Sequence, residues 1–153
     1  MLGMSAHGDE CEDSRVRMAK MSVEGITLVN DTGRLKSIDT HVARSNETRA
    51  AGYQHICEAM VERTTILFVY PKEHLGRFHM QNVRVPLDIG FFDSEGRLLK
   101  VMLMDTYKDG NRKLYDPGVP FQYALEAPEG FFRGHKLSQG RSRLVLHSVN
   151  DLL

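Results

Sequence analysis

The chain has 153 residues, and its 20 Lys and Arg residues balance 20 Asp and Glu residues, so the formal net charge is zero. This length suits one domain with a hydrophobic core, since a chain of this size buries roughly 70% of its unfolded surface. Balanced charge argues against a nucleic-acid-binding protein that works through a global positive field. No apolar run approaches the roughly 18 residues that a membrane helix needs, so we expect a soluble protein that binds neither nucleic acid nor a membrane.

The first 20 residues are expected to form a flexible tail, because they contain few large apolar residues. An acidic cluster within residues 9–13 occupies the place where a secretory signal would have its apolar stretch. We therefore expect no export signal and a cytoplasmic location. Two cysteines, Cys11 and Cys57, are too few for a disulfide scaffold, and the sequence leaves open whether they form a single bridge.

Residues 21–153 are interpreted as one β domain, because short extended runs alternate there with turn residues. The expected strands, in chain order, are residues 23–29, 35–43, 64–70, 76–80, 87–92, 97–106, 121–126 and 141–147. Turns are predicted at residues 30–33, 93–96 and 109–111, where Gly, Asn and Asp gather. The run at 98–104 is apolar on both faces, which predicts a central or covered strand.

One short helix is predicted at residues 47–57, with Ser45 and Asn46 supplying capping side chains at its start. Residues 128–132 are expected to add a single helical turn that begins at proline. About eight short strands with one helix are typical of an all-β fold, either a jelly-roll-like β-sandwich or a barrel.

The most distinctive stretch is residues 76–96, which read GRFHMQNVRVPLDIGFFDSEG. An aromatic residue near a Met-x-Asn segment, then Pro-Leu-Asp, an apolar run and an Asp followed by a Gly-containing turn resemble the signature of the Domain of Unknown Function 192 family. Supporting matches, in the same order as in the family, lie at residues 49–52, 66–70, 123–126, 130 and 140. The resemblance spans about residues 23 to 147 and implies a jelly-roll-like β-sandwich of bacteria and archaea with no established activity.

The chain departs from the family pattern at four places. Val83 stands where the family often has Thr, and Arg141 follows Gly140 where an acidic residue is common. His79 stands where the family usually has Trp, and Tyr53-Gln54 replaces Leu-Met after the helix glycine. We expect the ligand of this chain to differ from the ligands of its relatives if these positions meet in space.

Asp88 is the most informative polar residue of the sequence. It lies between Pro86 and Phe92 on one face of an extended segment, where a carboxylate is partly desolvated unless it accepts hydrogen bonds. We favour a structural role, as an acceptor for loop N–H groups, over a role as general base or ligand. If the chain bends back after residue 82, His79 would approach Asp88 and form a carboxylate–imidazole pair.

Glu126 ends an apolar strand, and it is interpreted either as a second carboxylate of a pocket or as a residue that faces solvent. The seven histidines show no zinc-ligand spacing, so we expect neither a metal nor another cofactor.

Our leading hypothesis is a binding module for a small polar ligand. The candidate ligand-binding residues are Tyr53, His79, Gln81, Asn82, Asp88 and Glu126. The first alternative is a hydrolase or isomerase that uses His79 and Asp88 as an acid–base pair. The second alternative is a protein–protein adaptor that binds its partner through a sheet edge.

Overall fold

A computed structural model describes residues 6–107 and 112–147 of the chain, with side chains from residue 11 onward. Within these residues, strands form one mixed sheet in the order β5-β4-β6-β3-β2-β1-β7. The strands are β1 (Ser22–Val29), β2 (Leu35–Ala43), β3 (Ile66–His74), β4 (Leu87–Phe92), β5 (Leu98–Met104), β6 (Phe121–Pro128) and β7 (Arg143–Leu146). β2 and β3 pair in parallel, and the other neighbours are antiparallel.

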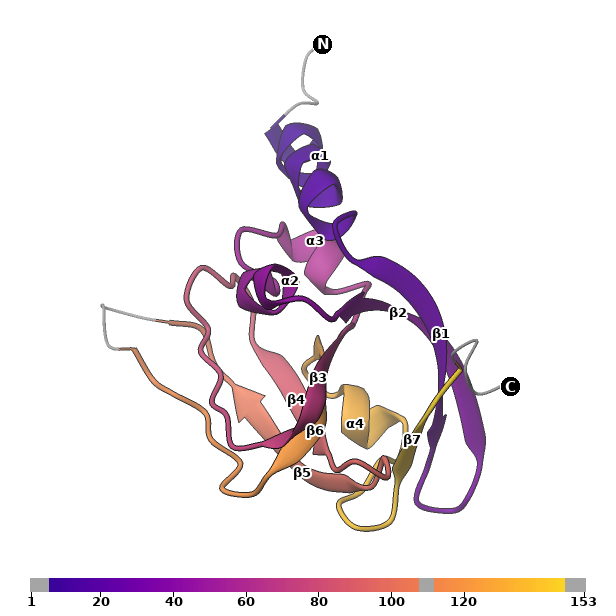
Figure 1. Ribbon diagram of the computed structural model, residues 1–153. Coiled ribbons are helices and arrows are strands. Elements are labelled where there is room, and N and C mark those ends of the chain that lie inside the picture. Colours follow the sequence, from indigo (N-terminus) through magenta and orange to yellow (C-terminus); the bar gives the residue numbers. More distant parts are fainter. Residues whose placement is uncertain (1–5, 108–111, 148–153) are drawn as a thin grey trace.

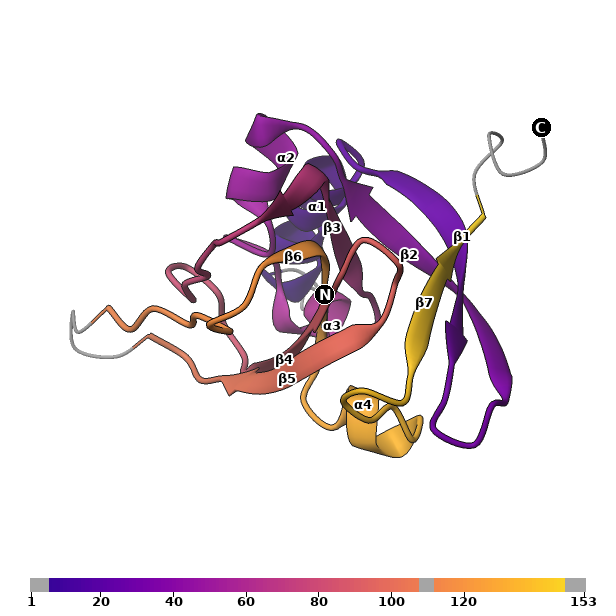
Figure 2. The same ribbon diagram turned by 60° about the horizontal axis from the view of Figure 1, so that its bottom comes forward.

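The sheet curves strongly, so that its two edge strands approach each other (Figures 1 and 2). Arg97, just before β5, forms an isolated bridge with Arg143 of β7, and no continuous ladder closes the sheet in the described part of the chain. The mainly β fold predicted from the sequence is therefore confirmed as one open, mixed sheet. Its jelly-roll-like form stays a prediction.

Four short helices accompany the sheet in the described residues, namely α1 (Ala6–Met18), α2 (Asn46–Ala51), α3 (Glu58–Val61) and α4 (Phe131–Gly134). The first three lie together, and α4 lies apart from them near β7 (Figure 1). None of the helices in this part of the chain has the length and apolar character needed to cross a membrane.

The helix predicted at residues 47–57 is confirmed only in its first part, because α2 ends at Ala51 and α3 begins at Glu58, beyond the predicted end. Ser45 caps α2 as expected, and its hydroxyl accepts a hydrogen bond from the Thr48 N–H at 3.0 Å. The helix ends at Gly52, whose φ of 46° lies in the left-handed region that favours glycine. His55 also has a positive φ, so the chain cannot continue as one helix to residue 57.

Two strand predictions differ from the structure. Residues 76–80 form no strand, and Phe78 there makes only an isolated bridge to Tyr115. The run at 98–104 is not central, because β5 is an edge strand and Leu103 on it is 51% exposed. The strand that is buried on both faces is its neighbour β4, whose six residues are all buried. The turn predicted at residues 109–111 lies outside the described residues.

Both faces of the central strands are covered, because side chains alternate along each strand between two apolar clusters. The first cluster includes Ile66, Phe68, Ile89, Phe91 and Ala124. The second includes Leu67, Phe92, Leu125, Phe132 and Leu144. A polar side chain on β4 or on the buried part of β6, residues 124–127, therefore enters an apolar layer whichever face it points to.

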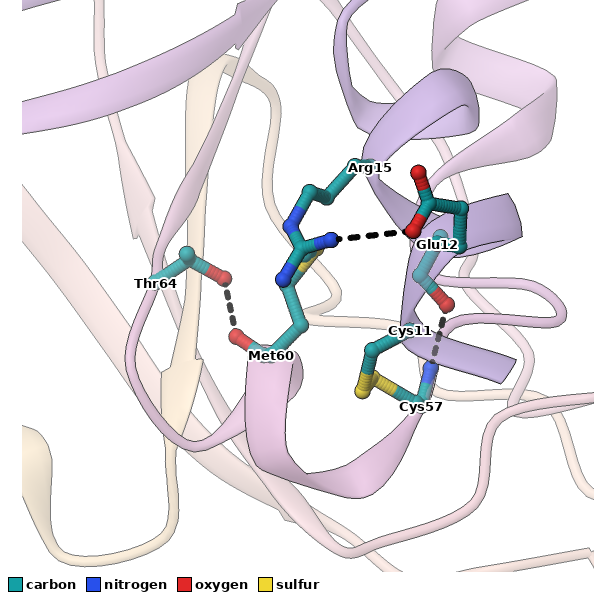
Figure 3. Close-up of a disulfide and its surroundings, with 7 residues drawn as sticks. Cys11, Glu12, Arg15, Cys57, Met60 and Thr64 are labelled. Carbon is teal, nitrogen blue, oxygen red and sulfur yellow. Dashed lines mark hydrogen bonds and ion pairs between the residues drawn. A yellow bond between two sulfur atoms is a disulfide. The ribbon is translucent and has the colours of Figure 1, made fainter. Parts of the chain in front are cut away.

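Residues 11–18 are bound to the rest of the chain, although the sequence led us to expect a flexible tail there. Cys11 on α1 and Cys57 before α3 form a disulfide with 5.4 Å between their Cα atoms (Figure 3). The Ser14 hydroxyl accepts a hydrogen bond from the Cys57 N–H at 2.8 Å. Met18 at the end of α1 is buried in the first apolar cluster. Residues 11–18 are thus anchored by one covalent bond, one hydrogen bond and apolar packing.

Replacing both Cys11 and Cys57 by Ser is expected to lower the free energy of unfolding by about 2–4 kcal/mol, because the bridge restrains the unfolded chain. The two cysteines are 46 residues apart in sequence, which makes the loop that the bridge closes a long one. Urea unfolding of the wild type and the double variant measures the difference. A reducing agent should destabilise the wild type by a similar amount and leave the double variant unchanged. Equal stability of the two oxidised proteins would contradict a structural role of the bridge.

Candidate functional site

A cavity of about 310 Å³ opens between α2, β3, β6 and the loop before β4. Its lining comes from four parts of the chain that are distant in sequence. The residues that line it are Asn46, Arg49, Ala50, Ala51, Gly52, Tyr53, Phe68, Tyr70, Arg77, Phe78, His79, Val83 and Glu126. This volume is at the lower end of the range of about 300–1,000 Å³ that small-molecule sites occupy.

Glu126 is a buried acidic residue in the wall of the cavity. It lies on β6 between Ile66 of β3 and Ile89 of β4, and only 5% of the residue is exposed. No described residue donates a hydrogen bond to its carboxyl group. In the described residues, every side-chain oxygen or nitrogen that is fully enclosed has a hydrogen-bond partner. The carboxyl oxygens of Glu126 have none, so they are not fully enclosed and must contact the cavity. Burial raises the pKa of Glu126 to about 8, and the carboxyl group therefore holds its proton at neutral pH.

Two tyrosines stand beside Glu126 in the wall of the cavity. Burial raises the pKa of Tyr70 to about 12, and the charge of Glu126 acts in the same direction. Burial likewise raises the pKa of Tyr53, against the effect of its hydrogen bond with Thr64. The Thr64 hydroxyl donates to the Met60 carbonyl (Figure 3), so the Tyr53 hydroxyl is the donor in the 2.8 Å bond to Thr64. Tyr53 is thus fixed in place by the segment after α3.

Arg49 on α2 is held in one orientation by acceptors on neighbouring segments. Its guanidinium donates to the Val69 carbonyl at 2.9 Å, to the Asn46 side chain at 2.7 Å and to the Arg44 carbonyl. It lies 5.0 Å from the centre of the Tyr70 ring, which is a cation–π contact. Arg77, from the loop after β3, adds a second positive charge and is exposed at the mouth of the cavity.

His79 also lines the cavity. Its Nδ1 atom accepts a hydrogen bond from the Gln81 N–H at 3.1 Å, so the proton of the neutral ring is on Nε2. Burial lowers the pKa of His79, and the charge of Arg112 lowers it further. At neutral pH the ring is therefore mainly uncharged.

Of the six candidate residues from the sequence, the structure brings three together in the cavity, namely Tyr53, His79 and Glu126. Gln81 and Asn82 are exposed in the turn beyond the cavity. Asn82 has a φ of 61°, and its side-chain amide donates to the Gln54 side chain at 3.0 Å. These two residues form a turn, which the Asn82 side chain ties to the segment after α2.

Asp88 lies apart from the cavity, on the other face of the sheet. Its carboxylate accepts a hydrogen bond from the Gly130 N–H at 2.8 Å, beside α4. Burial raises the pKa of Asp88, and the bond from Gly130 opposes this effect. The structural interpretation of Asp88 as a loop acceptor fits this geometry, although its partner is Gly130 and not the loop before β4.

The position of Asp88 removes the basis of the acid–base hypothesis. His79 lines the cavity, whereas Asp88 is occupied beside Gly130. Asp88 and Glu126 also alternate onto different faces, since Glu126 is opposite Ile89 and Asp88 is opposite Ala127. The structure therefore pairs Asp88 neither with His79 nor with Glu126.

Arg49, Arg77 and Tyr70 belong to the cavity but were not among the candidates from the sequence. The only sequence signal was that all three residues fall in segments that resemble parts of the family pattern. Nothing in the spacing of the three residues indicates that they meet. In the described residues, no group of three or more His, Cys, Asp or Glu side chains is placed to hold a metal ion.

A family model named DUF192, described as "Uncharacterized ACR", matches residues 27–144. The chain belongs to the DUF192 family, in agreement with the resemblance of its motifs. No curated protein matches the sequence.

Two solved structures share the fold. One is a Sinorhizobium meliloti protein described as a candidate transcription regulator, with 22% sequence identity and a TM-score of 0.72 over 81% of this chain and 93% of that chain. The other is a Novosphingobium aromaticivorans protein of unknown function, with 18% identity and a TM-score of 0.68 over 81% and 85% of the two chains. Likeness at this level of identity shows the fold alone.

The raised pKa of Glu126 predicts how stability changes with pH. Its ordinary value is 4.5 and its folded value is about 8, so the folded protein binds the extra proton between these values. The contribution of Glu126 to the free energy of unfolding is therefore largest below pH 4.5, and it falls as pH rises to about 8. Glu126→Gln has no such dependence, and near pH 9 it should exceed the wild type by up to about 5 kcal/mol, since one pKa unit is about 1.4 kcal/mol.

Urea unfolding at about pH 5, 7 and 9 measures this difference. Glu129→Gln is the matched control, because Glu129 is an exposed glutamate near the end of the same strand. Parallel stability curves for the wild type and Glu126→Gln would show that Glu126 ionises normally.

Proposed function

We propose that this protein is a binding module for a small polar ligand that occupies the cavity above Glu126. The observation that carries the proposal is the carboxyl group of Glu126, which belongs to a residue only 5% exposed, reaches the cavity and receives no hydrogen bond from the described chain. Buried polar groups nearly always have a partner, because leaving one unsatisfied costs about 1–3 kcal/mol. A ligand with a hydroxyl, amide or carbonyl group would supply that partner.

The walls of the cavity support a ligand with some apolar surface. Phe68, Tyr70 and Phe78 present aromatic rings, and Phe68 and Phe78 pack edge to face with 5.3 Å between ring centres. An apolar wall with a few fixed polar groups is the usual composition of a small-molecule site. His79 and Tyr53, which depart from the family pattern, both line this cavity. This supports a ligand that differs from those of relatives with Trp and Leu there.

The two alternative functions have weaker support. A hydrolase or isomerase that depends on His79 and Asp88 lacks the required pair. An adaptor would use an exposed edge of the sheet, and the edge strands β5 and β7 expose Leu103 and Val145. Nothing in the described residues identifies a protein partner for these edges.

The proposal is tested by thermal shift against a panel of sugars, organic acids, nucleotides, amides and amines. A bound ligand at 100 times its Kd should add about 2.7 kcal/mol of stability. We expect a hit with the wild type that Glu126→Leu abolishes, because Leu removes the hydrogen-bonding group and fills part of the cavity. Asp88→Asn is the control, since it lies on the other face of the sheet and should keep the hit.

A hit that survives in Glu126→Leu would place the ligand elsewhere on the molecule. No hit across the panel would count against the binding module and direct attention to the sheet edges as protein-binding surfaces.

The cytoplasmic location expected from the sequence is not favoured by the Cys11–Cys57 bridge. Disulfides persist mainly in oxidising compartments, because thiol pools keep cytosolic cysteines reduced. We propose that the protein works in an oxidising compartment. Alkylation of thiols in intact cells should leave Cys11 and Cys57 unlabelled until a reducing agent is added. Labelling of both cysteines before reduction would support the cytoplasm.

A further inference from the structure

The side chains of the cavity carry an unbalanced positive charge. Arg49 and Arg77 line it, and neither has a carboxylate within ion-pair distance in the described residues. Glu126 is the single acidic side chain among the described lining residues. Its proton is retained at neutral pH because burial raises its pKa to about 8, so it does not neutralise the two arginines.

The guanidinium group of Arg49 is already fixed in one orientation, so it can bind a hydrogen-bond acceptor without being immobilised further. A guanidinium has five N–H groups, and Arg49 donates three hydrogen bonds to Arg44, Asn46 and Val69. Two of its N–H groups are therefore left for a ligand. Because the other bonds and the Tyr70 ring already fix the guanidinium, little conformational entropy would be lost on binding.

The polar groups of the cavity differ in how far they are buried. Glu126 is buried, Arg49 is half-buried and Arg77 is exposed. The aromatic residues Phe68, Tyr70 and Phe78 lie in the same lining. A ligand that uses all of these groups would need a neutral polar end inside and a negative end toward the mouth.

We infer that the ligand is a small organic anion, whose acidic group binds Arg49 and Arg77 and whose hydroxyl or amide end binds Glu126. This inference rests on the proposed binding function and specifies its ligand class. The acidic group is a carboxylate or a phosphate, since both accept paired hydrogen bonds from a guanidinium. A neutral ligand leaves both arginines without a counterion, and a cationic ligand is repelled by them.

Glu126 shares the cavity with five other charged or titratable side chains of the described residues. They are Arg49 from α2, Tyr53 from the segment after it, Tyr70 from β3, and Arg77 and His79 from the loop before β4. As pH rises through about 8, Glu126 loses its proton, and with it a hydrogen-bond donor. Its new negative charge also repels an anion, so affinity for the anion should fall.

The test compares two matched series of probes by isothermal titration calorimetry. The first is glycerol, glycerate and glycerol phosphate, and the second is glucose, glucuronate and glucose phosphate. Within each series one terminal CH2OH group is left unchanged, oxidised to a carboxylate or esterified with phosphate, so the two acidic members also separate a carboxylate from a phosphate. We expect at least one acidic probe to bind about tenfold or more tighter than its neutral parent, the ratio that one charge-assisted hydrogen bond supplies.

Three variants locate the effect. Arg77→Gln should weaken the acidic probe about tenfold and leave the neutral parent unchanged. Arg34→Gln removes the same charge from an exposed position outside the cavity and should change neither. Glu126→Gln keeps a neutral donor, so it should bind the acidic probe at neutral pH and lose the decline in affinity above pH 8.

Equal affinity for neutral and acidic probes, or equal effects of Arg77→Gln and Arg34→Gln, would overturn the anion inference and leave the proposed binding function standing. Binding of no member of either series at millimolar concentration would also overturn it. The thermal-shift panel, which contains neutral and basic compounds, then decides the proposed function separately.

Discussion

Burial of the central strands on both faces is the constraint on which the rest of the structure depends. A sheet with only one covered face can direct polar side chains to water, but β4 and residues 124–127 of β6 cannot. Each of these strands nevertheless carries a carboxyl group. Asp88 on β4 is satisfied by a backbone N–H from the chain before α4. Glu126 on β6 meets no such donor, and the cavity lies where this residue faces the first apolar cluster.

Much of the fold could be predicted from alternating apolar residues and turn chemistry, and the errors have physical causes. The run at 98–104 is apolar on both faces, yet β5 lies at an edge, because apolar content reports burial and not strand order. The helix expected to residue 57 ends at Gly52, where a positive φ stops it. Residues 11–18 are held by a disulfide and by Met18, contacts with distant residues that local composition does not reveal.

The candidate site was predictable only in part, because a sequence gives residue types and strand positions but not which face each strand turns toward a neighbour. Tyr53, His79 and Glu126 were found because they fall within or beside recognisable motifs. Asp88 falls within the same signature and serves the fold instead. Arg49 and Arg77 become neighbours of Glu126 only through the order of strands β3 and β6 and the position of α2, information that no local pattern contains.

The pairing of β1 with β7 has a consequence for how the chain must assemble during synthesis. Thr27 of β1 and His147, just after β7, are in contact although they are 120 residues apart in sequence. On the ribosome, β1 is therefore made long before its outer neighbour exists. During that interval its backbone N–H and carbonyl groups form an open edge, the kind of surface that recruits strands of other chains. The short C-terminal strand therefore completes the sheet and also covers the edge that would otherwise favour aggregation of the newly made protein.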